Sequence, residues 1–266
     1  MRKPLIVLKL GGSALTDKKR IFTPREAEIH RAAGQIARLR NRFSLVVVHG
    51  AGSYGHIPVR QWGLESGFRS RRQIEGLAAT KSKLLEWEEI FDRIFLKHKI
   101  PLIPFLASDF VVTRNGRISS ADLRPVRNWL SIDCVPSTGG DIVSDLKNGF
   151  SILSGDQLAA YLSVELKASR LIFGTDVDGI FSADPKHDPH AHIISELTAR
   201  TALHAAARAG VSDAPDVTGG MAGKIIEATR AASNGIPIYF VNLTVGNRLA
   251  NLGLNREVPC SKIVPS

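Results

Sequence analysis

The sequence of 266 residues has little cysteine, few aromatic residues and no long apolar run: it contains two cysteines, and 6% of its residues are aromatic. A disulfide-stabilised fold needs more cysteines in a much shorter chain, so we exclude that class and expect a reducing compartment, the cytoplasm. The apolar run near the N-terminus, Leu5–Leu8, is far too short to span a membrane or to form the core of a secretion signal. We therefore expect no membrane segment and no targeting segment.

Acidic residues are also few, with 25 Asp and Glu against 35 Lys and Arg, which gives a net charge of +10. Such an excess suggests an anionic partner. The basic residues are nevertheless dispersed in short groups, such as those at 69–72, 81–83 and 97–99, and groups of this kind on helices are usually solvated faces. We therefore expect small anionic ligands and no nucleic acid. With 44% hydrophobic and 23% charged residues, the composition is otherwise that of a globular protein.

Apolar runs of strand length alternate with segments of helical periodicity along nearly the whole chain. We predict strands at 5–9, 45–49, 101–105, 170–173 and 237–241, and helices at 24–40, 73–97, 155–167 and 220–234. This alternation is typical of an α/β fold with an open, mainly parallel central sheet that helices cover on both faces. A chain of this length suits one large domain or two closely packed lobes.

Short local signals add detail to this pattern. Asn115-Gly116 lies between two apolar runs and predicts a β-hairpin, and Asn148-Gly149 predicts a second one. The parallel sheet is thus expected to carry antiparallel decorations. Thr23 and Glu26 have the spacing of a capping box, with Pro24 at the first helical position, so we predict that the helix begins there.

Glycine-rich segments follow the first two predicted strands, at the strand ends where α/β sheets bind their ligands. Lys9-Leu-Gly-Gly-Ser13 places a lysine beside backbone amides that an anion can approach, although a tight turn alone also uses glycine. The second segment, His49–His56, contains three glycines, which is more than a turn requires. It favours a backbone cradle for phosphate, with His56 as a hydrogen-bond donor to an oxyanion.

Three later motifs carry charge. Asp156 opens a predicted helix, where it either caps the helix or organises lysines around a phosphate. Lys224 lies four residues after Gly220 at the start of another helix, a position suited to the terminal phosphates of a nucleotide. Between them, Asp176 and Asp178 follow a strand and suit a metal site, a ribose site or an acidic turn. The Walker A spacing is absent, so the chain is not a P-loop NTPase.

Taken in this order, the five motifs resemble the amino acid kinase family. The second motif reads Gly-x-Gly-Ser-Tyr-Gly-His56. Its final histidine makes it resemble the branch of the family that contains the isopentenyl phosphate kinases and fosfomycin kinases. The resemblance implies one αβα-sandwich domain, residues 1–266, with an acceptor-binding lobe at 1–168 and a nucleotide-binding lobe at 169–266. It also implies a homodimer. Ala51, Gln157 and Gly174 depart from the family pattern, in which a glycine, a second acid and an aliphatic residue are commoner.

The resemblance also implies the activity: ATP-dependent, Mg²⁺-assisted phosphorylation of isopentenyl phosphate to isopentenyl diphosphate, a step of isoprenoid precursor synthesis. The alternatives are a kinase of another small phosphate or phosphonate, and a non-catalytic nucleotide sensor. The implied catalytic residues are Lys9, Lys18, Asp156 and Lys224. The implied acceptor-binding residues are Gly11, Ala51, Gly52, His56 and Gly155. The implied nucleotide-binding residues are Lys9, Gly12, Gly52, Asp176, Asp178, Gly179, Lys186, Gly220 and Lys224.

The chemistry of a phosphate acceptor agrees with these residue types. A phosphomonoester is largely ionised at neutral pH because its second pKa is about 6, so its attack requires no general base. Bringing two polyanions together requires positive charge, which lysines, helix amides and Mg²⁺ on the ATP phosphates supply; we expect no protein ligand to the metal. For the acceptor's apolar tail the sequence offers a set of side chains that ordinary packing would equally explain: Trp62, Phe68, Ile74, Leu77 and Ala78.

Overall fold

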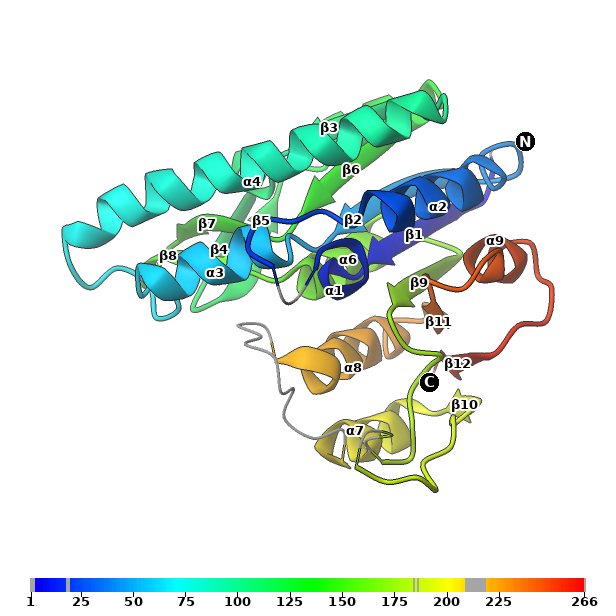
Figure 1. Ribbon diagram of the computed structural model, residues 1–266. Helices are drawn as coiled ribbons and strands as arrows, with labels where there is room; N and C mark the ends of the chain where they lie inside the picture. The colour runs from blue at the N-terminus through cyan, green and yellow to red at the C-terminus, as the bar shows by residue number, and fades with distance from the viewer. Residues whose placement is uncertain (1–2, 18–19, 184, 186, 209–218, 266) are drawn as a thin grey trace.

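The computed structural model describes residues 3–17, 20–183, 185, 187–208 and 219–265 (Figure 1). Its larger sheet has eight strands in the order β10-β12-β11-β9-β1-β2-β6-β3, and all neighbours are parallel except β11 and β12. These strands are β1 (Leu5–Leu10), β2 (Ser44–His49), β3 (Leu102–Phe105), β6 (Val135–Gly139), β9 (Arg170–Thr175), β10 (Glu196–Leu197), β11 (Ile238–Asn242) and β12 (Cys260–Ile263).

Helices cover both faces of this sheet, as expected (Figure 1). Side chains alternate along β1, so Val7 packs into the core beneath α6 and α8, whereas Leu8 packs into the core beneath α2 and α4. The predicted αβα architecture is therefore confirmed. The helices are α1 (Gly12–Leu15), α2 (Glu26–Ala37), α3 (Ser53–Gln61), α4 (Arg72–Lys97), α5 (Arg124–Ser131), α6 (Gly155–Glu165), α7 (Ala199–Arg208), α8 (Gly220–Ala232) and α9 (Arg248–Gly253), with a 3₁₀ turn at Ala107–Asp109. None of the helices in the described ranges is both long and apolar enough to cross a bilayer.

A second sheet of four strands contains both predicted hairpins. Its order is β5-β4-β7-β8, where β4 is Val111–Arg114, β5 Arg117–Ala121, β7 Asp141–Asp145 and β8 Gly149–Leu153. Asn115 and Gly116 both have positive φ angles, 52° and 76°, the geometry that a two-residue hairpin turn requires. The hairpin signals in the sequence are thus confirmed.

The predicted capping box is wrong. α2 begins at Glu26 with Arg25 as its N-cap, and no side chain caps it. Thr23 instead donates its hydroxyl to the Ile21 carbonyl, and Pro24 pairs with Thr16 in an antiparallel bridge. This bridge holds the chain extended immediately before the helix, which is why the helix starts later than its sequence signal.

The segment that follows β2 also differs from the expectation. No helix was predicted in the glycine-rich segment His49–His56, but α3 begins at Ser53, directly after Gly52. Tyr54 and Val59 of α3 are buried against neighbouring elements. Tertiary packing therefore stabilises a helix in a sequence whose glycines disfavour one.

Candidate active site

Charged side chains from three elements meet at the carboxyl ends of the strands. Lys9 lies near the end of β1, and strand alternation turns its side chain toward the face that α6 covers. Its ammonium nitrogen lies 2.7 Å from Asp156 Oδ1, and Lys224 Nζ of α8 donates to Asp156 Oδ2 over 2.8 Å. Three of the four predicted catalytic residues thus form one cluster. The fourth, Lys18, lies outside the described residues.

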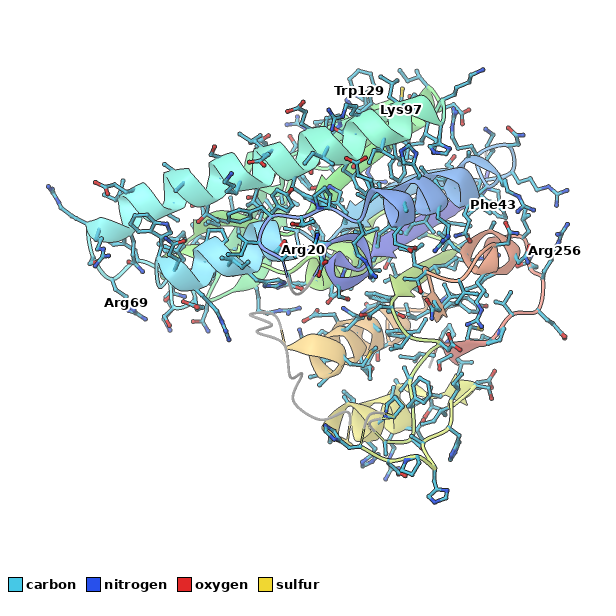
Figure 2. The ribbon with its side chains drawn as sticks, viewed as in Figure 1. Arg20, Phe43, Arg69, Lys97, Trp129 and Arg256 are labelled. Atoms are coloured by element: carbon cyan, nitrogen blue, oxygen red, sulfur yellow. The ribbon has the colours of Figure 1, made fainter. Side chains whose placement is uncertain are left out.

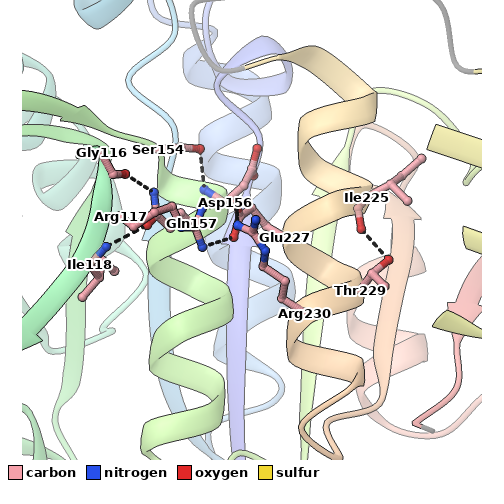
Figure 3. Close-up of polar contacts among 10 residues, drawn as sticks. All are labelled: Gly116, Arg117, Ile118, Ser154, Asp156, Gln157, Ile225, Glu227, Thr229 and Arg230. Carbon is pink, nitrogen blue, oxygen red and sulfur yellow. Dashed lines mark hydrogen bonds and ion pairs between the residues drawn. The ribbon is translucent and has the colours of Figure 1, made fainter. Parts of the chain in front are cut away.

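The start of α6 separates the two roles that the sequence left open for Asp156. Ser154 is the N-cap residue, and its hydroxyl accepts the Asp156 amide hydrogen at 3.1 Å (Figure 3). Because Ser154 caps the helix, the Asp156 carboxylate is available to both lysines. Asp156 therefore pairs with both lysines, whereas Ser154 caps the helix.

Burial and charge act against each other in this cluster. Burial lowers the pKa of Lys9 to about 8, with Asp156 opposing that shift and Lys224 adding to it. Burial alone would raise the pKa of Asp156, but the charges and hydrogen bonds of Lys224 and Lys9 outweigh it and hold that pKa well below its usual range. Two ammonium groups around one carboxylate leave a net positive site, which favours a polyanionic ligand.

Two glycine-rich loops touch each other through their backbones beside this cluster. A Cβ atom on Gly12 would lie 2.6 Å from the Gly52 nitrogen, and one on Gly50 would lie 2.5 Å from the Gly12 nitrogen. Gly52 has a φ of 51°, which favours glycine. Thr16 joins the loops by donating to the Gly12 carbonyl and accepting from the Ser53 amide. The glycines are therefore required for this close approach of the two backbones.

The start of α6 adjoins the same loops. A Cβ atom on Gly155 would lie 3.3 Å from the His49 carbonyl oxygen and 3.6 Å from Lys9 Cε. His56 is the fourth residue of α3 and is half-buried. Of the predicted acceptor-binding residues, Gly11, Ala51 and Gly52 thus lie on the two loops, Gly155 begins α6, and His56 lies in the first turn of α3.

The residues after β9 contact three neighbouring elements: α9, β11 and β12. Asp178 accepts hydrogen bonds from Arg248 at 2.5 Å and from Asn242 at 2.8 Å, which ties this segment to α9 and β11. A Cβ atom on Gly179 would lie 2.5 Å from Ser261 Oγ of β12. Both residues thus have packing roles here, and their contacts with a nucleotide stay a prediction.

The remaining predicted nucleotide-binding residues are placed as follows. Gly220 begins α8 with a φ of 59°, directly after Gly219 with a φ of 88°. Asp176 follows β9 and is half-buried. Lys186 lies outside the described residues. Two successive left-handed residues at this helix start explain the paired glycines.

One basic residue that we assigned to a solvated group is paired. Lys81 of α4 donates to Asp141 at 2.7 Å and 2.8 Å and to Ser108 at 2.7 Å. The Asp141 side chain is only 4% exposed. The assignment of Lys81 to a solvated face was wrong because its partner is 60 residues away, beyond the reach of any local pattern.

A buried titratable cluster lies behind the second glycine loop. Trp87 Nε1 of α4 donates to His49 Nδ1 at 3.0 Å, so the ring proton of a neutral His49 resides on Nε2, 2.7 Å from Glu88 Oε2. Asp92 lies one helical turn after Glu88, and burial, reinforced by the Glu88 charge and opposed by His49, raises its pKa to about 7. Two carboxyl groups are thus held close together in the interior.

We expect Asp92→Asn to stabilise the protein at pH 8 and to stabilise it much less at pH 5. The raised pKa means that the folded state binds the proton more tightly than the unfolded chain, so stability falls as the pH rises from roughly 4 to 7. The partly exposed carboxyl reduces the gain to about 1 kcal/mol at pH 8. Urea unfolding at both pH values measures it, and an equal difference at pH 5 and pH 8 would contradict the assignment.

The fold and the Lys9–Asp156–Lys224 cluster define a phosphotransferase of the αβα-sandwich class. The chain belongs to the amino acid kinase family, which it matches over residues 4–242. It is 34% identical to the isopentenyl phosphate kinase of Methanothermobacter thermautotrophicus, over 97% of this chain and 98% of that protein. It is also 34% identical to the isopentenyl phosphate kinase of Haloferax volcanii, over 83% of this chain and 86% of that protein.

A comparison with solved structures also shows similarity to an isopentenyl phosphate kinase. An X-ray structure of isopentenyl phosphate kinase matches with a TM-score of 0.85 and 31% sequence identity, covering 97% of this chain and 100% of that one. The family resemblance carried by the five motifs is thereby confirmed.

Proposed function

We infer that this protein transfers the terminal phosphoryl group of ATP to isopentenyl phosphate, which yields isopentenyl diphosphate and ADP. The observation that carries this inference is the buried Lys9–Asp156–Lys224 cluster beside two contacting glycine loops. His56 in the first turn of α3 and the kinship with isopentenyl phosphate kinases support the choice of acceptor.

The residues suit a loose transition state between two anions. The acceptor phosphate brings its own ionised oxygen, so the site has to supply position and positive charge. Lys9 and Lys224, with Lys18 as a proposed third cation, would stabilise the transferring group while Asp156 keeps the lysines in place. His56 and the amides of the second glycine loop would hold the acceptor phosphate.

Mg²⁺ would enter with ATP. It supplies further positive charge to the phosphates when bound. The Asp156 carboxylate is already paired with two lysines, and the described part of the chain holds no group of three or more potential metal-binding side chains of His, Cys, Asp or Glu. The side chains of the described site therefore fit a magnesium ion whose ligands are phosphate oxygens and water.

The acceptor's tail would lie beyond His56. Arg60 follows His56 by one helical turn and lines a cavity of about 470 Å³ whose opposite wall includes Phe150 and Ile152 of β8. Of the side chains suggested for the tail, Trp62 and Leu77 pack with this wall, whereas three others are exposed: Phe68, Ile74 and Ala78. Most of the lining is polar, and Phe150 and Ile152 give it an apolar patch on which the short hydrocarbon chain would pack.

We further propose the cytoplasm as the compartment and a homodimer as the assembly. Cys134 and Cys260 are both free thiols, which agrees with a reducing compartment. The family resemblance supports the dimer. It also supports the division into an acceptor lobe at 1–168 and a nucleotide lobe at 169–266.

The acceptor is tested by ADP release with Mg-ATP and a matched panel: isopentenyl phosphate, dimethylallyl phosphate, longer isoprenyl phosphates, fosfomycin, UMP and acetylglutamate. We expect selective turnover of isoprenyl phosphates. Selective turnover of fosfomycin would replace the acceptor but keep the kinase, and no turnover of any member would overturn the proposal.

His56→Ala should raise the KM for isopentenyl phosphate by about tenfold or more, because it removes a donor to the acceptor phosphate. Its KM for ATP should change little. His98→Ala serves as the matched control, since His98 pairs with His30 on the outer helices. Unchanged acceptor kinetics in His56→Ala would remove this histidine from the site.

A further inference from the structure

The side chain of Gln157 holds the β4–β5 hairpin against the start of α6. Gln157 Oε1 accepts the Ile118 amide hydrogen at 3.0 Å, and Nε2 donates to the Gly116 carbonyl at 3.1 Å (Figure 3). Gln157 is buried and directly follows Asp156 in the chain. An ionised acid at this position would accept the first bond but, lacking a donor, would face the Gly116 carbonyl with a negative charge. The amide is thus specific to this contact.

The hairpin that Gln157 holds is itself rigid. The buried carboxylate of Asp145 accepts the amide hydrogens of Asn115 at 3.1 Å and Gly116 at 2.8 Å. It also accepts those of Lys147 and Asn148 in the turn of the other hairpin, at 2.9 Å and 2.8 Å. Burial alone would raise the pKa of Asp145, but the hydrogen bonds from the Gly116, Asn148 and Lys147 amides and the Thr113 hydroxyl outweigh it and lower that pKa. One carboxylate therefore fixes both turns as a unit.

This unit forms part of the cavity assigned to the acceptor. Asn115, Gly116 and Asn148 line the cavity together with Arg60 and Arg69. Arg69 projects outward from the end of the molecule where α4 begins (Figure 2). The Gly116 carbonyl that Gln157 holds thus belongs to a residue of the cavity wall.

A second contact joins the same hairpin to α8. Arg117 makes two hydrogen bonds to Glu227, Nη1 to Oε1 at 2.5 Å and Nη2 to Oε2 at 3.0 Å (Figure 3). Glu227 lies three residues after Lys224 on this helix and is only 12% exposed. Arg230 also donates to Glu227, at 2.8 Å, from the next turn of α8. The hairpin is therefore attached beside both Asp156 and Lys224.

We propose that Gln157 is a positioning residue that aligns the acceptor cavity with the Lys9–Asp156–Lys224 cluster, and that the Arg117–Glu227 pair supports this alignment from α8. The proposal rests on the proposed function. If the acceptor displaces the hairpin, Gln157 moves with it. The adjacent Asp156, which pairs with both lysines, is then displaced as well. Phosphoryl transfer depends on this alignment, because misplacing the acceptor by about 1 Å costs roughly 100-fold in rate.

Gln157→Glu tests the proposal with almost no change of shape. At pH 8 we expect kcat for isopentenyl phosphate to fall about tenfold, because the donor to Gly116 is replaced by a repelling carboxylate. The affinity for a non-hydrolysable ATP analogue should change less than twofold. Burial raises the pKa of the introduced carboxyl, so a growing fraction of it binds a proton and regains a donor as the pH falls toward 5.5, and the kcat ratio of the variant to wild type should rise. Dividing the kcat of the variant by that of wild type at each pH removes the pH dependence that the two enzymes share.

The pair on α8 is tested by a double-mutant cycle. We expect Arg117→Ala and Glu227→Ala each to lower kcat by about threefold, and the double variant to be no worse than the poorer single variant. Arg124→Ala is the matched control, because Arg124 makes equally short bonds to Asp122 but is highly exposed and not attached to a site-bearing helix. Its kcat should equal that of wild type.

The outcomes separate this proposal from the proposed function. If wild type phosphorylates isopentenyl phosphate but Gln157→Glu shows the same kcat at every pH, the positioning role is wrong and the kinase assignment stands. A lower unfolding temperature with unchanged kcat would likewise overturn it, because Gln157 would then be a purely structural contact. If wild type itself fails to turn over the acceptor, the proposed function is what fails.

Discussion

Asp156→Asn is expected to lower kcat for isopentenyl phosphate by about 100- to 1000-fold, the range for loss of a preorganised electrostatic group. Asparagine keeps the shape of the side chain but removes the charge that both lysines share, at 2.7 Å and 2.8 Å. It also leaves two ammonium groups facing each other in a buried site. Burial already lowers the pKa of Lys9 to about 8, and loss of the opposing carboxylate favours its neutral form further.

The same substitution should reduce stability at neutral pH by about 3 kcal/mol, because it leaves buried charges without a partner. In wild type the lowered pKa of Asp156 contributes stability above roughly pH 4, and this contribution is lost as the solution is acidified. The variant should therefore show a weaker acid dependence of its urea midpoint. Turnover is compared with Asp122→Asn, which removes an exposed carboxylate paired with Arg124. Wild-type kcat in Asp156→Asn would show that the carboxylate does not organise the lysines.

The parts of the structure that local sequence predicted correctly are those set by neighbouring residues. Lys9 could be predicted to lie at a strand end because it closes an apolar run of strand length that two glycines follow. Strand ends are where α/β sheets bind their ligands. The hairpin at Asn115-Gly116 was predicted from the left-handed conformations that its turn needs. In both cases the chemistry and the geometry lie within a few residues of each other.

The parts that could not be predicted depend on contacts across the chain. Local sequence cannot show that Gln157 bonds to Gly116, 41 positions earlier, and the family pattern presented Gln157 only as a departure. The helix α3 forms despite Gly55 and Pro58 in its interior because it packs against α4. Thr23 failed as a helix cap because a bridge between Thr16 and Pro24 holds that segment extended. Tertiary structure overrides local propensity in each of these cases.

Gly50→Ala is expected to destabilise the protein by about 3 kcal/mol and to abolish most of its activity. The new Cβ would lie 2.5 Å from the Gly12 nitrogen and 2.9 Å from the Gly12 Cα, so it would collide with backbone that no rotamer change can move aside. The two loops would have to separate. This separation would strain the hydrogen bond from the Gly50 amide to the Leu10 carbonyl, 2.9 Å long, and displace the loop backbone that we propose to bind the phosphates.

Gly246→Ala is the matched control, because no atom lies within 4 Å of its added Cβ and its φ is not positive. Urea unfolding and ADP release are measured for both variants at equal protein concentration. The difference between them isolates the contact between the loops, since each adds one methyl group to a glycine outside the helices and strands. If Gly50→Ala unfolds and turns over like Gly246→Ala, the loops do not approach closely and the phosphate-binding geometry proposed here is wrong. A variant that keeps its stability but loses turnover would instead place the effect in the anion-binding amides alone.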